Sequence, residues 1–342
     1  MTLRMGSTLL GFAAAGVALA TAGTKFAVSR RPSMPSDTSR YAIGCPPGED
    51  AGGELRAIFL GVSTIALTDG HTTIMTDGFF SRPPLWQVLG SRIRSNSARI
   101  DAALRIANIT EVEAIFVAHS HYDHALDSPA VAWRTGATMV GSSSTMNIGR
   151  GWGLAADQMC MPDLEEPLRY GKFRVQVIAS EHSPHPKFTG VISDPVIAPA
   201  RAGAYKMAEC YSFHITHTSE SGKVRRLVIH PSAGFIPGMF THYGADAVFL
   251  GVGPLGKQSE DFRNQYWRET VGELGAQRVY PIHWDDFTTP LGPPLVAMPY
   301  LADDFDVTLR MLEHHRAVDG IEFAIPEPFV RIDPFADMSA PS

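Results

Sequence analysis

A stretch with the sequence HSHYDH begins at His119 and contains four side chains that can bind a metal. Neutral imidazole and carboxylate are preferred ligands of zinc and similar divalent ions. In an extended stretch, residues i and i+2 project to the same side, so His119 and His121 can hold one ion. Asp123 and His124, beyond the bend, can face a second ion. The stretch follows a buried strand predicted at 113–118, where so many polar groups cannot all be buried without a compensating partner.

Two further histidines follow predicted strands. His182 comes after the strand predicted at 173–180, and His283 comes after the strand predicted at 278–282. Either histidine alone would more often be an ordinary loop or core residue. Beside the HSHYDH stretch, each can supply the missing ligand of a tetrahedral site. The sequence therefore predicts a metal centre assembled from separate strand ends.

Short runs rich in β-branched and apolar residues predict strands from residue 55 onward. The predicted strands cover 55–60, 64–68, 72–76, 113–118, 137–141, 173–180, 210–217, 225–230, 246–251 and 278–282. The predicted helices cover 97–107, 128–135, 142–149, 259–274 and 303–316. Runs of strands with helices between them indicate two sheets that carry helices on their outer faces.

The HxHxDH pattern that begins at His119 resembles the signature motif of the metallo-β-lactamase superfamily. Asp77, in the sequence TDG after a strand, matches that family's first motif, a structural aspartate near the metal loop. His182 and His283 match its later ligand motifs. The resemblance covers residues 54 to 290, or to 332 at its widest. It implies an α/β (α+β) fold, the four-layer αββα sandwich, with the site at one edge between the two sheets.

The resemblance divides the six candidate ligands into two sets. It implies that one ion is held by His119, His121 and His182, and the other by Asp123, His124 and His283. Two divalent ions are therefore expected as cofactors. Zinc is the first expectation, and iron or manganese would accept the same ligands.

The sequence departs from the superfamily at one ligand position. Most of these hydrolases carry an aspartate that bridges the two ions, and Ser232 stands where it is expected. One subclass of true metallo-β-lactamases also has a serine there. The change removes a negative charge that would offset repulsion between the ions, so the second site is expected to be weak. His230 could substitute if the loop shifts by two residues; the alternative is a structural histidine at a strand end.

The expected activity follows from the metals. A bound cation lowers the pKa of a coordinated water to about 7. The resemblance therefore implies a metal-dependent hydrolase in which metal-bound hydroxide cleaves an ester, lactone or phosphodiester bond. Asp123 would orient the hydroxide as well as bind metal. His185 is predicted to be catalytic through the leaving group or substrate, with Tyr122 as a second candidate, and structural roles for both stay open.

Two other functions are carried as alternatives. A β-lactamase-type amide hydrolase is favoured by Ser232 and by predicted export. A non-catalytic metal-binding module that kept the fold is the other, and the complete ligand set argues against it. The 35 acidic residues outnumber the 29 basic ones, which argues against a nucleic-acid partner.

The substrate is expected to be a small molecule or a lipid. Residues 76–84 are similar to a segment in the branch that holds N-acylethanolamine phospholipase D and ascorbate-phosphate lactonases. An anionic group could be attracted by Arg82, Arg92, Arg94 and Arg99, and an apolar mouth could be lined by Phe79, Phe80, Trp86 and Trp284. A solvated charged face and ordinary core aromatics are the competing interpretations.

The amino terminus is predicted to be a separate segment. Residues 1–23 contain an apolar stretch with an A-x-A cleavage site, which indicates a signal peptide or, alternatively, a membrane anchor. The protein is therefore expected to be exported (periplasmic or secreted) or membrane-anchored, with membrane association through this segment. Residues 24–53 predict a flexible tether and 54–335 a single hydrolase domain. The three cysteines form no CxxC pair, and the oligomeric state stays open.

Overall fold

The computed structural model describes residues 29–33 and 54–338. The rest of the predicted leader and tether lies outside the described residues. In the part that is described, no helix has both the length and the apolar content needed to cross a bilayer. The signal peptide or anchor, the tether and the single-domain boundary at 54–335 stay predictions.

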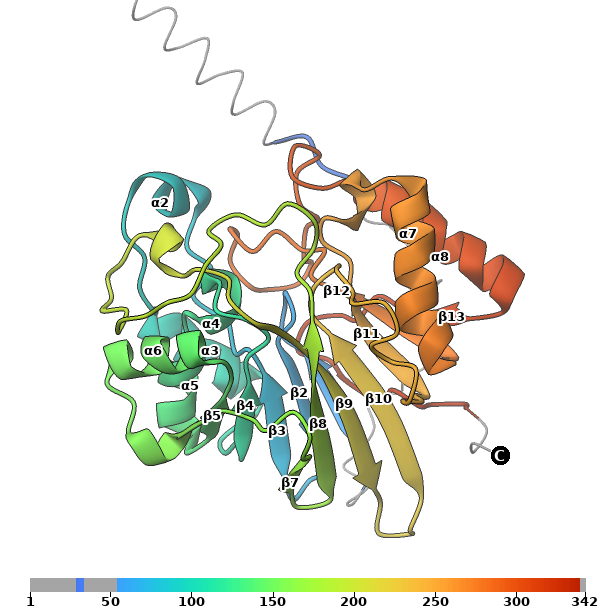
Figure 1. Ribbon diagram of the computed structural model, residues 1–342, viewed down its shortest axis with the longest axis horizontal. Helices are drawn as coiled ribbons and strands as arrows, with labels where there is room; N and C mark the ends of the chain where they lie inside the picture. The colour runs from blue at the N-terminus through green and yellow to red at the C-terminus, as the bar shows by residue number, and fades with distance from the viewer. Residues whose placement is uncertain (1–28, 34–53, 339–342) are drawn as a thin grey trace, which may run out of the picture.

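Two seven-stranded sheets face each other (Figure 1). The first has the strand order β14-β1-β2-β3-β4-β5-β6, and the second β13-β12-β11-β10-β9-β8-β7. The first sheet consists of β1 (Arg56–Phe59), β2 (Ile65–Thr68), β3 (Thr73–Thr76), β4 (Ala114–Phe116), β5 (Thr138–Val140), β6 (Met159–Cys160) and β14 (Arg331–Ile332). The second consists of β7 (Leu168–Tyr170), β8 (Phe173–Ser180), β9 (Cys210–Thr218), β10 (Val224–His230), β11 (Ala247–Gly251), β12 (Arg278–Ile282) and β13 (Glu322–Phe323).

Helices cover the outer face of each sheet (Figure 1). On the side of the first sheet lie α2 (Leu85–Gly90), α3 (Ser97–Ile106), α4 (Tyr122–Ala125), α5 (Ser128–Thr135) and α6 (Ser143–Trp152). On the side of the second sheet lie α7 (Glu260–Trp267) and α8 (Phe305–Asp319). The layers are therefore helix, sheet, sheet and helix, and the predicted αββα sandwich is confirmed.

The alternation of side chains along β1 shows why the sheets are layered in this way. Ala57 and Phe59 are buried in the core between the two sheets. Ile58, which points to the opposite face, belongs to a second core under α3, α5 and α6. Both faces of this strand are therefore apolar, as expected of a sheet covered on both sides.

The structure differs from the sequence expectation in its short elements. Helix α2 and the strands β6, β7, β13 and β14 were not predicted, because segments of two to six residues hold too little periodicity to be recognised. The helix predicted over 259–274 is α7 followed by a π-helical turn at Arg268–Gly272. None of these differences moves a strand end that carries a predicted metal ligand.

Candidate metal centre

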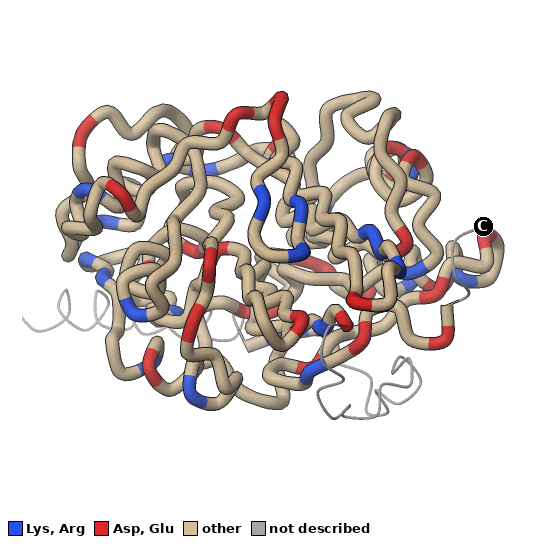
Figure 2. The backbone as a smooth tube through the Cα atoms, turned by 90° about the horizontal axis from the view of Figure 1, so that it is seen from below, with Lys and Arg blue, Asp and Glu red and all other residues tan. Residues whose placement is uncertain are grey.

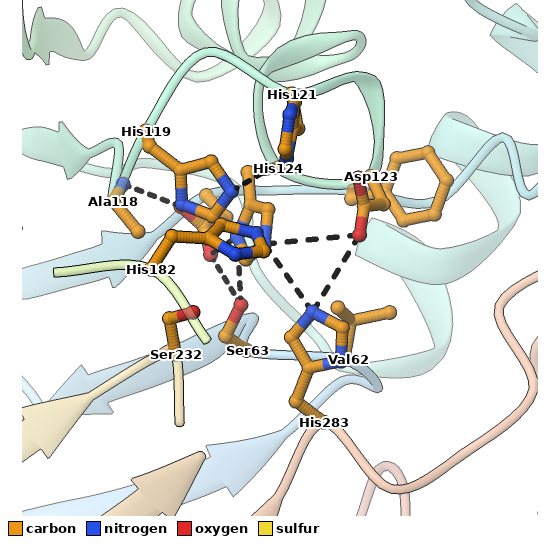
Figure 3. A network of polar contacts seen from close by, with 12 residues as sticks. Val62, Ser63, Ala118, His119, His121, Asp123, His124, His182, Ser232 and His283 are labelled. Atoms are coloured by element: carbon orange, nitrogen blue, oxygen red, sulfur yellow. Dashed lines mark hydrogen bonds and ion pairs between the residues drawn. The ribbon is translucent and has the colours of Figure 1, made fainter. Parts of the chain in front are cut away.

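Six side chains from three segments of the chain converge at one edge of the sandwich (Figure 3). They follow β4, β8 and β12, and they form two groups whose ligand atoms lie within 4.8 Å of one another. The first group is His119, His121 and His182, and the second is Asp123, His124 and His283. The structure thus brings together all six residues that the sequence predicts as ligands, in the predicted sets.

The first group has ligand atoms at a distance suited to a shared cation. Nε2 of His119 lies 3.1 Å from Nδ1 of His121. The His182 ring lies 4.8 Å from the His119 ring and 5.0 Å from the His121 ring, centroid to centroid. In a tetrahedral zinc site with Zn–N bonds of about 2.0–2.1 Å, ligand nitrogens are separated by about 3.3 Å. The observed spacing of His119 and His121 fits that geometry.

Hydrogen bonds outside the group orient two of these rings. Nε2 of His121 lies 2.7 Å from the carbonyl oxygen of Lys187, so that nitrogen donates and Nδ1 keeps its lone pair for a cation. Nδ1 of His182 lies 3.0 Å from both the carbonyl oxygen and Oγ of Ser183, which leaves its Nε2 free. Neither residue needs to rotate to bind a cation.

The second group forms a compact triangle. Nε2 of His283 lies 3.3 Å from Nε2 of His124 and 3.5 Å from Oδ2 of Asp123. Nε2 of His124 lies 3.8 Å from the same oxygen of Asp123. The His119 and His124 rings are 4.0 Å apart, so the two groups are adjacent and can hold two neighbouring ions.

Asp77 fixes the tautomer of His124. Its Oδ2 lies 2.8 Å from Nδ1 of His124 and accepts a 2.6 Å hydrogen bond from Oγ of Ser63. Its Oδ1 accepts from the backbone N–H of Ala118. Because Nδ1 of His124 donates to Asp77, the lone pair of Nε2 points to the second group. The role predicted for Asp77, a structural aspartate beside the metal loop, agrees with these contacts.

A buried ion pair supports His283. The His283 backbone N–H donates to the carbonyl oxygen of Val62, and the N–H of Val62 donates to Asp285. Asp285 pairs with Arg82 at 2.5 Å, and both side chains are fully buried. Arg82 also donates to the carbonyl oxygens of Thr289 and Asp286. The suggestion that Arg82 attracts a substrate is therefore wrong; its guanidinium braces the loop that carries His283.

The chemistry of the two groups fits divalent cations. Burial and the neighbouring histidines hold the pKa of His119 well below its usual range, and burial lowers the pKa of His182 to about 4. Neutral imidazoles with facing lone pairs attract a cation and gain little from one another. Burial raises the pKa of Asp123, but the histidines around it outweigh burial and the net shift is downward, which keeps a carboxylate in the second group.

Ser232 and His230 have separate roles at the end of β10. Oγ of Ser232 accepts a 3.0 Å hydrogen bond from the backbone N–H of Ser183, beside His182 (Figure 3). The His230 ring points elsewhere, with Nδ1 2.7 Å from Oγ of Ser212 and its face against Tyr266. His230 therefore lies outside both groups, which supports the structural alternative.

A pocket of about 240 Å³ opens onto the two groups. Its walls include His121, Asp123, His182 and His283 together with Pro184, His185, Lys187, Phe188, Phe287, Met298 and Asp303. His185 is exposed in this wall. Tyr122 instead packs edge-on against Phe79 and Phe287.

The aromatic residues proposed for the mouth lie elsewhere. Phe79 and Phe80 are at most 1% exposed in the core, and Trp284 is stacked on Phe305. Trp86, which is 70% exposed, belongs to α2. For these buried rings the core interpretation is correct. The apolar wall is formed by Phe188, Phe287 and Met298, which the sequence did not single out because they lie in irregular loops without periodicity.

The other three arginines proposed to attract an anion are not walls of this pocket. Arg92 donates to the carbonyl oxygen of Pro199, and Arg99 donates to the carbonyl oxygens of Ser81 and Arg82. Arg94 is exposed between α2 and α3. Apart from the histidines, Lys187 is the basic residue among the described residues of this pocket wall.

No protein-family model matches the sequence, and no curated protein matches it significantly. Solved structures do match. A possible metal-dependent hydrolase from Veillonella parvula is 13% identical with a TM-score of 0.50, covering 82% of this chain and 100% of that one. CmlA, a diiron β-hydroxylase from Streptomyces venezuelae, is 15% identical with a TM-score of 0.50; the match covers 82% of this chain but 54% of CmlA.

A third similar structure is the metallo-β-lactamase fold protein YhfI from Bacillus subtilis. It is 12% identical with a TM-score of 0.48, and the match covers 81% of this chain and 98% of that one. Identities this low are evidence about the fold alone.

Proposed function

We propose that this chain, which has the metallo-β-lactamase fold, is a metal-dependent hydrolase of an ester, lactone or phosphodiester bond. One observation carries the proposal. Two adjacent groups, each of three His or Asp ligands, open onto a single pocket. Such a constellation at the ends of separate strands serves no packing purpose, because it buries several polar rings together.

The residues divide the work of hydrolysis. His119, His121 and His182 would hold one cation, and Asp123, His124 and His283 the other. When bound, such ions supply a hydroxide near neutral pH and stabilise negative charge that develops on the substrate. The carboxylate of Asp123 can also accept a hydrogen bond from the attacking water. The carbonyl of Lys187 and the carboxylate of Asp77 keep two of the imidazoles in the ligand tautomer.

The pocket walls support an ester, lactone or phosphodiester with an apolar substituent. Phe188, Phe287 and Met298 offer apolar contact beside the cluster. Lys187 adds one positive charge, enough for a singly charged group such as a phosphodiester. The Veillonella parvula structure is described as a possible metal-dependent hydrolase, which supports the general class of reaction. A small molecule or a lipid fits these walls.

The metals are proposed to be zinc, with iron and manganese as alternatives that bind the same ligands. Ser232 brings no charge to the space between the ions, so the second ion is expected to bind more weakly than the first. CmlA, which shares the fold, is described as a diiron protein. Metal identity is therefore part of the test.

The charge balance supports a partner other than nucleic acid. Acidic residues outnumber basic ones by 35 to 29, and Figure 2 shows Lys and Arg interspersed with Asp and Glu along the backbone in that view. A nucleic-acid site would require a basic stripe or patch.

Export or membrane anchoring through residues 1–23 remains part of the proposal. The carbonyl oxygen of Arg30 accepts from the backbone N–H of Tyr300, and Arg31 pairs with Asp286 at 2.6 Å. These contacts tie the chain that follows the apolar segment to the loop bearing the wall residue Met298. Fractionation of cells, with the amino-terminal residue of the mature chain determined by mass spectrometry, tests this part.

Elemental analysis of the purified protein, coupled to a substrate panel, tests the proposed activity. We expect one to two divalent ions per chain and hydrolysis of bis-p-nitrophenyl phosphate, a p-nitrophenyl ester or a lactone. His121→Ala should abolish turnover. His71→Ala, which removes an exposed histidine in the turn between β2 and β3, should not. Turnover that survives chelation or His121→Ala would contradict the proposal.

Two alternatives have distinct signatures in the same panel. A β-lactamase, favoured by Ser232, would turn over nitrocefin faster than the esters. A non-catalytic module would turn over nothing and would keep its full stability without metal. Either outcome would replace the proposed activity.

A further inference from the structure

Asp303 is an acidic wall residue of the pocket that the metal-binding groups do not use. Among the described residues of the wall, the acidic ones are Asp123 and Asp303. Asp123 faces His283 and belongs to the second group. Asp303 lies just before α8. The carboxyl group of Asp303 therefore has no assigned role in the pocket where hydrolysis is proposed.

The two oxygens of Asp303 have different surroundings. Oδ1 accepts backbone N–H groups from Gly256 at 3.1 Å and from Asp304 at 2.8 Å. Oδ2 is buried and has no hydrogen-bond partner among the described residues. The residue is 1% exposed. A buried oxygen without a partner is costly, and a polar group that entered the pocket could satisfy it.

A purely structural role would need Oδ1 alone, because that atom accepts both the N–H of Gly256 and the N–H of Asp304 at the start of α8. Burial raises the pKa of Asp303 to about 6, although the two N–H donors and Lys257 lower it. A carboxyl group with these properties can carry a proton and release it near neutral pH. The terminal torsion of aspartate is broad, so Oδ2 can turn toward a group that enters the pocket.

We propose that Asp303 is the general acid of this pocket and donates the proton of its Oδ2 hydroxyl to the leaving oxygen of the substrate. The inference rests on the proposed hydrolase function. The bond from the acyl carbon or phosphorus to the leaving oxygen breaks, and its electron pair stays on that oxygen. The proton from Asp303 joins it, so an alcohol departs. The carboxylate recovers a proton released by the attacking water. His185, which the sequence predicts for this role and which is also in the pocket wall, is the competing candidate.

A leaving-group series tests the proposal. The substrates share one acyl or phosphoryl group and carry p-nitrophenyl, phenyl or alkyl alcohols. A good leaving group needs no proton, so Asp303→Asn should change p-nitrophenyl turnover by less than about threefold. It should lower phenyl and alkyl turnover by about 10²- to 10⁴-fold. Asp304→Asn, which removes a charge one residue away and outside the pocket wall, should show no such dependence.

Other outcomes overturn the proposal. An equal loss for every leaving group in Asp303→Asn would make the residue structural. A leaving-group-dependent loss in His185→Ala but not in Asp303→Asn would assign the acid to His185. Metal content and melting temperature are measured for each variant, so that a damaged cluster is recognised.

The wild-type protein decides the question if Asp303→Asn does not fold. A general acid makes kcat/KM nearly independent of leaving-group pKa, and a steep decline across the series would overturn the proposal. Failure of the metal-loaded wild type to hydrolyse any substrate would instead overturn the proposed function, and the role of Asp303 with it.

Discussion

Asp77 and His124 form a fully buried pair in which Oδ2 of the carboxylate lies 2.8 Å from Nδ1 of the imidazole. Asp77 has a positive φ of 55°, a conformation that brings its carboxylate under α4 directly after β3. The same carboxylate accepts from Ser63 and from the backbone of Ala118. It therefore connects the end of β3, the end of β4 and a predicted metal ligand through separate hydrogen bonds.

Asp77→Asn should weaken the second metal site. In the wild type, one carboxylate oxygen of Asp77 accepts from His124 and the other accepts from the backbone N–H of Ala118. An asparagine amide has one oxygen, which can accept from only one of these two donors. If its NH₂ faces His124, the ring proton must move to Nε2, which then cannot bind a cation. We expect a 10- to 100-fold loss of affinity for the second ion, measured by titration of metal-free protein.

A matched control separates this effect from general charge loss. Asp101→Asn removes an exposed carboxylate that pairs with Arg134 and should leave both metal affinities unchanged. Unchanged second-site affinity in Asp77→Asn would contradict the tautomer argument.

Arg82→Met should destabilise the fold and the second site together. The change leaves the buried Asp285 carboxylate without its cation, which typically costs about 3–5 kcal/mol. Asp285 also accepts the N–H of Val62, whose carbonyl oxygen holds the backbone of His283. Urea denaturation and metal titration measure the two effects.

Arg134→Met provides the comparison for that prediction. Its partner Asp101 is half exposed, and exposed pairs contribute less than about 1 kcal/mol. Similar losses in Arg82→Met and Arg134→Met would show that the buried pair does not brace His283.

The candidate metal centre could be predicted from sequence because its proposed ligands are concentrated and follow recognisable strands. Four potential ligands lie within the six residues of the HSHYDH stretch, a density that favours metal binding over an ordinary polar loop. His182 and His283 follow strands long or apolar enough to be recognised. Strand ends are fixed by apolar runs, so ligands that follow them could be placed without coordinates. The same apolar runs also allowed the layered fold to be predicted.

The pocket walls could not be predicted, because they depend on how loops return over the cluster. Phe79 and Phe80 were candidates for the mouth, but the buried Asp127 carboxylate accepts the backbone N–H of Phe80 and turns that segment into the core. Phe188 and Asp303 line the pocket from segments that carry no periodic pattern. A short sequence pattern contains no information about such long-range contacts.

Ser232→Asp should strengthen the second site. The side chain lies in the pocket wall beside His182 and would bring the negative charge that the space between the ions lacks. We expect a higher fraction of chains with two ions when metal is limiting, measured by elemental analysis after competition with a chelator. Ser232→Asn, which has the same size without the charge, should keep the wild-type ratio. An equal gain in both variants would mean that charge is not the cause.

The stability conferred by Asp303 should depend on pH in a direction set by its burial. Burial raises the pKa of Asp303 from 3.8 to about 6. The protonated form is therefore favoured in the folded state, and its stabilisation is fully present below pH 3.8 and lost as pH rises through about 6. Relative to low pH, the ionised carboxyl disfavours folding by on the order of 3 kcal/mol.

Asp303→Asn does not ionise, so it escapes that loss. The variant should gain stability relative to wild type between about pH 4.5 and pH 7.5, because over that range only the wild-type residue acquires a buried charge. Urea denaturation of both proteins at the two pH values measures the difference, in which the other titrating groups cancel. An identical difference at both pH values would show that folding does not raise the pKa of Asp303. A gain at the higher pH would mean that the residue is kept at a cost to stability, as expected of a group retained for catalysis.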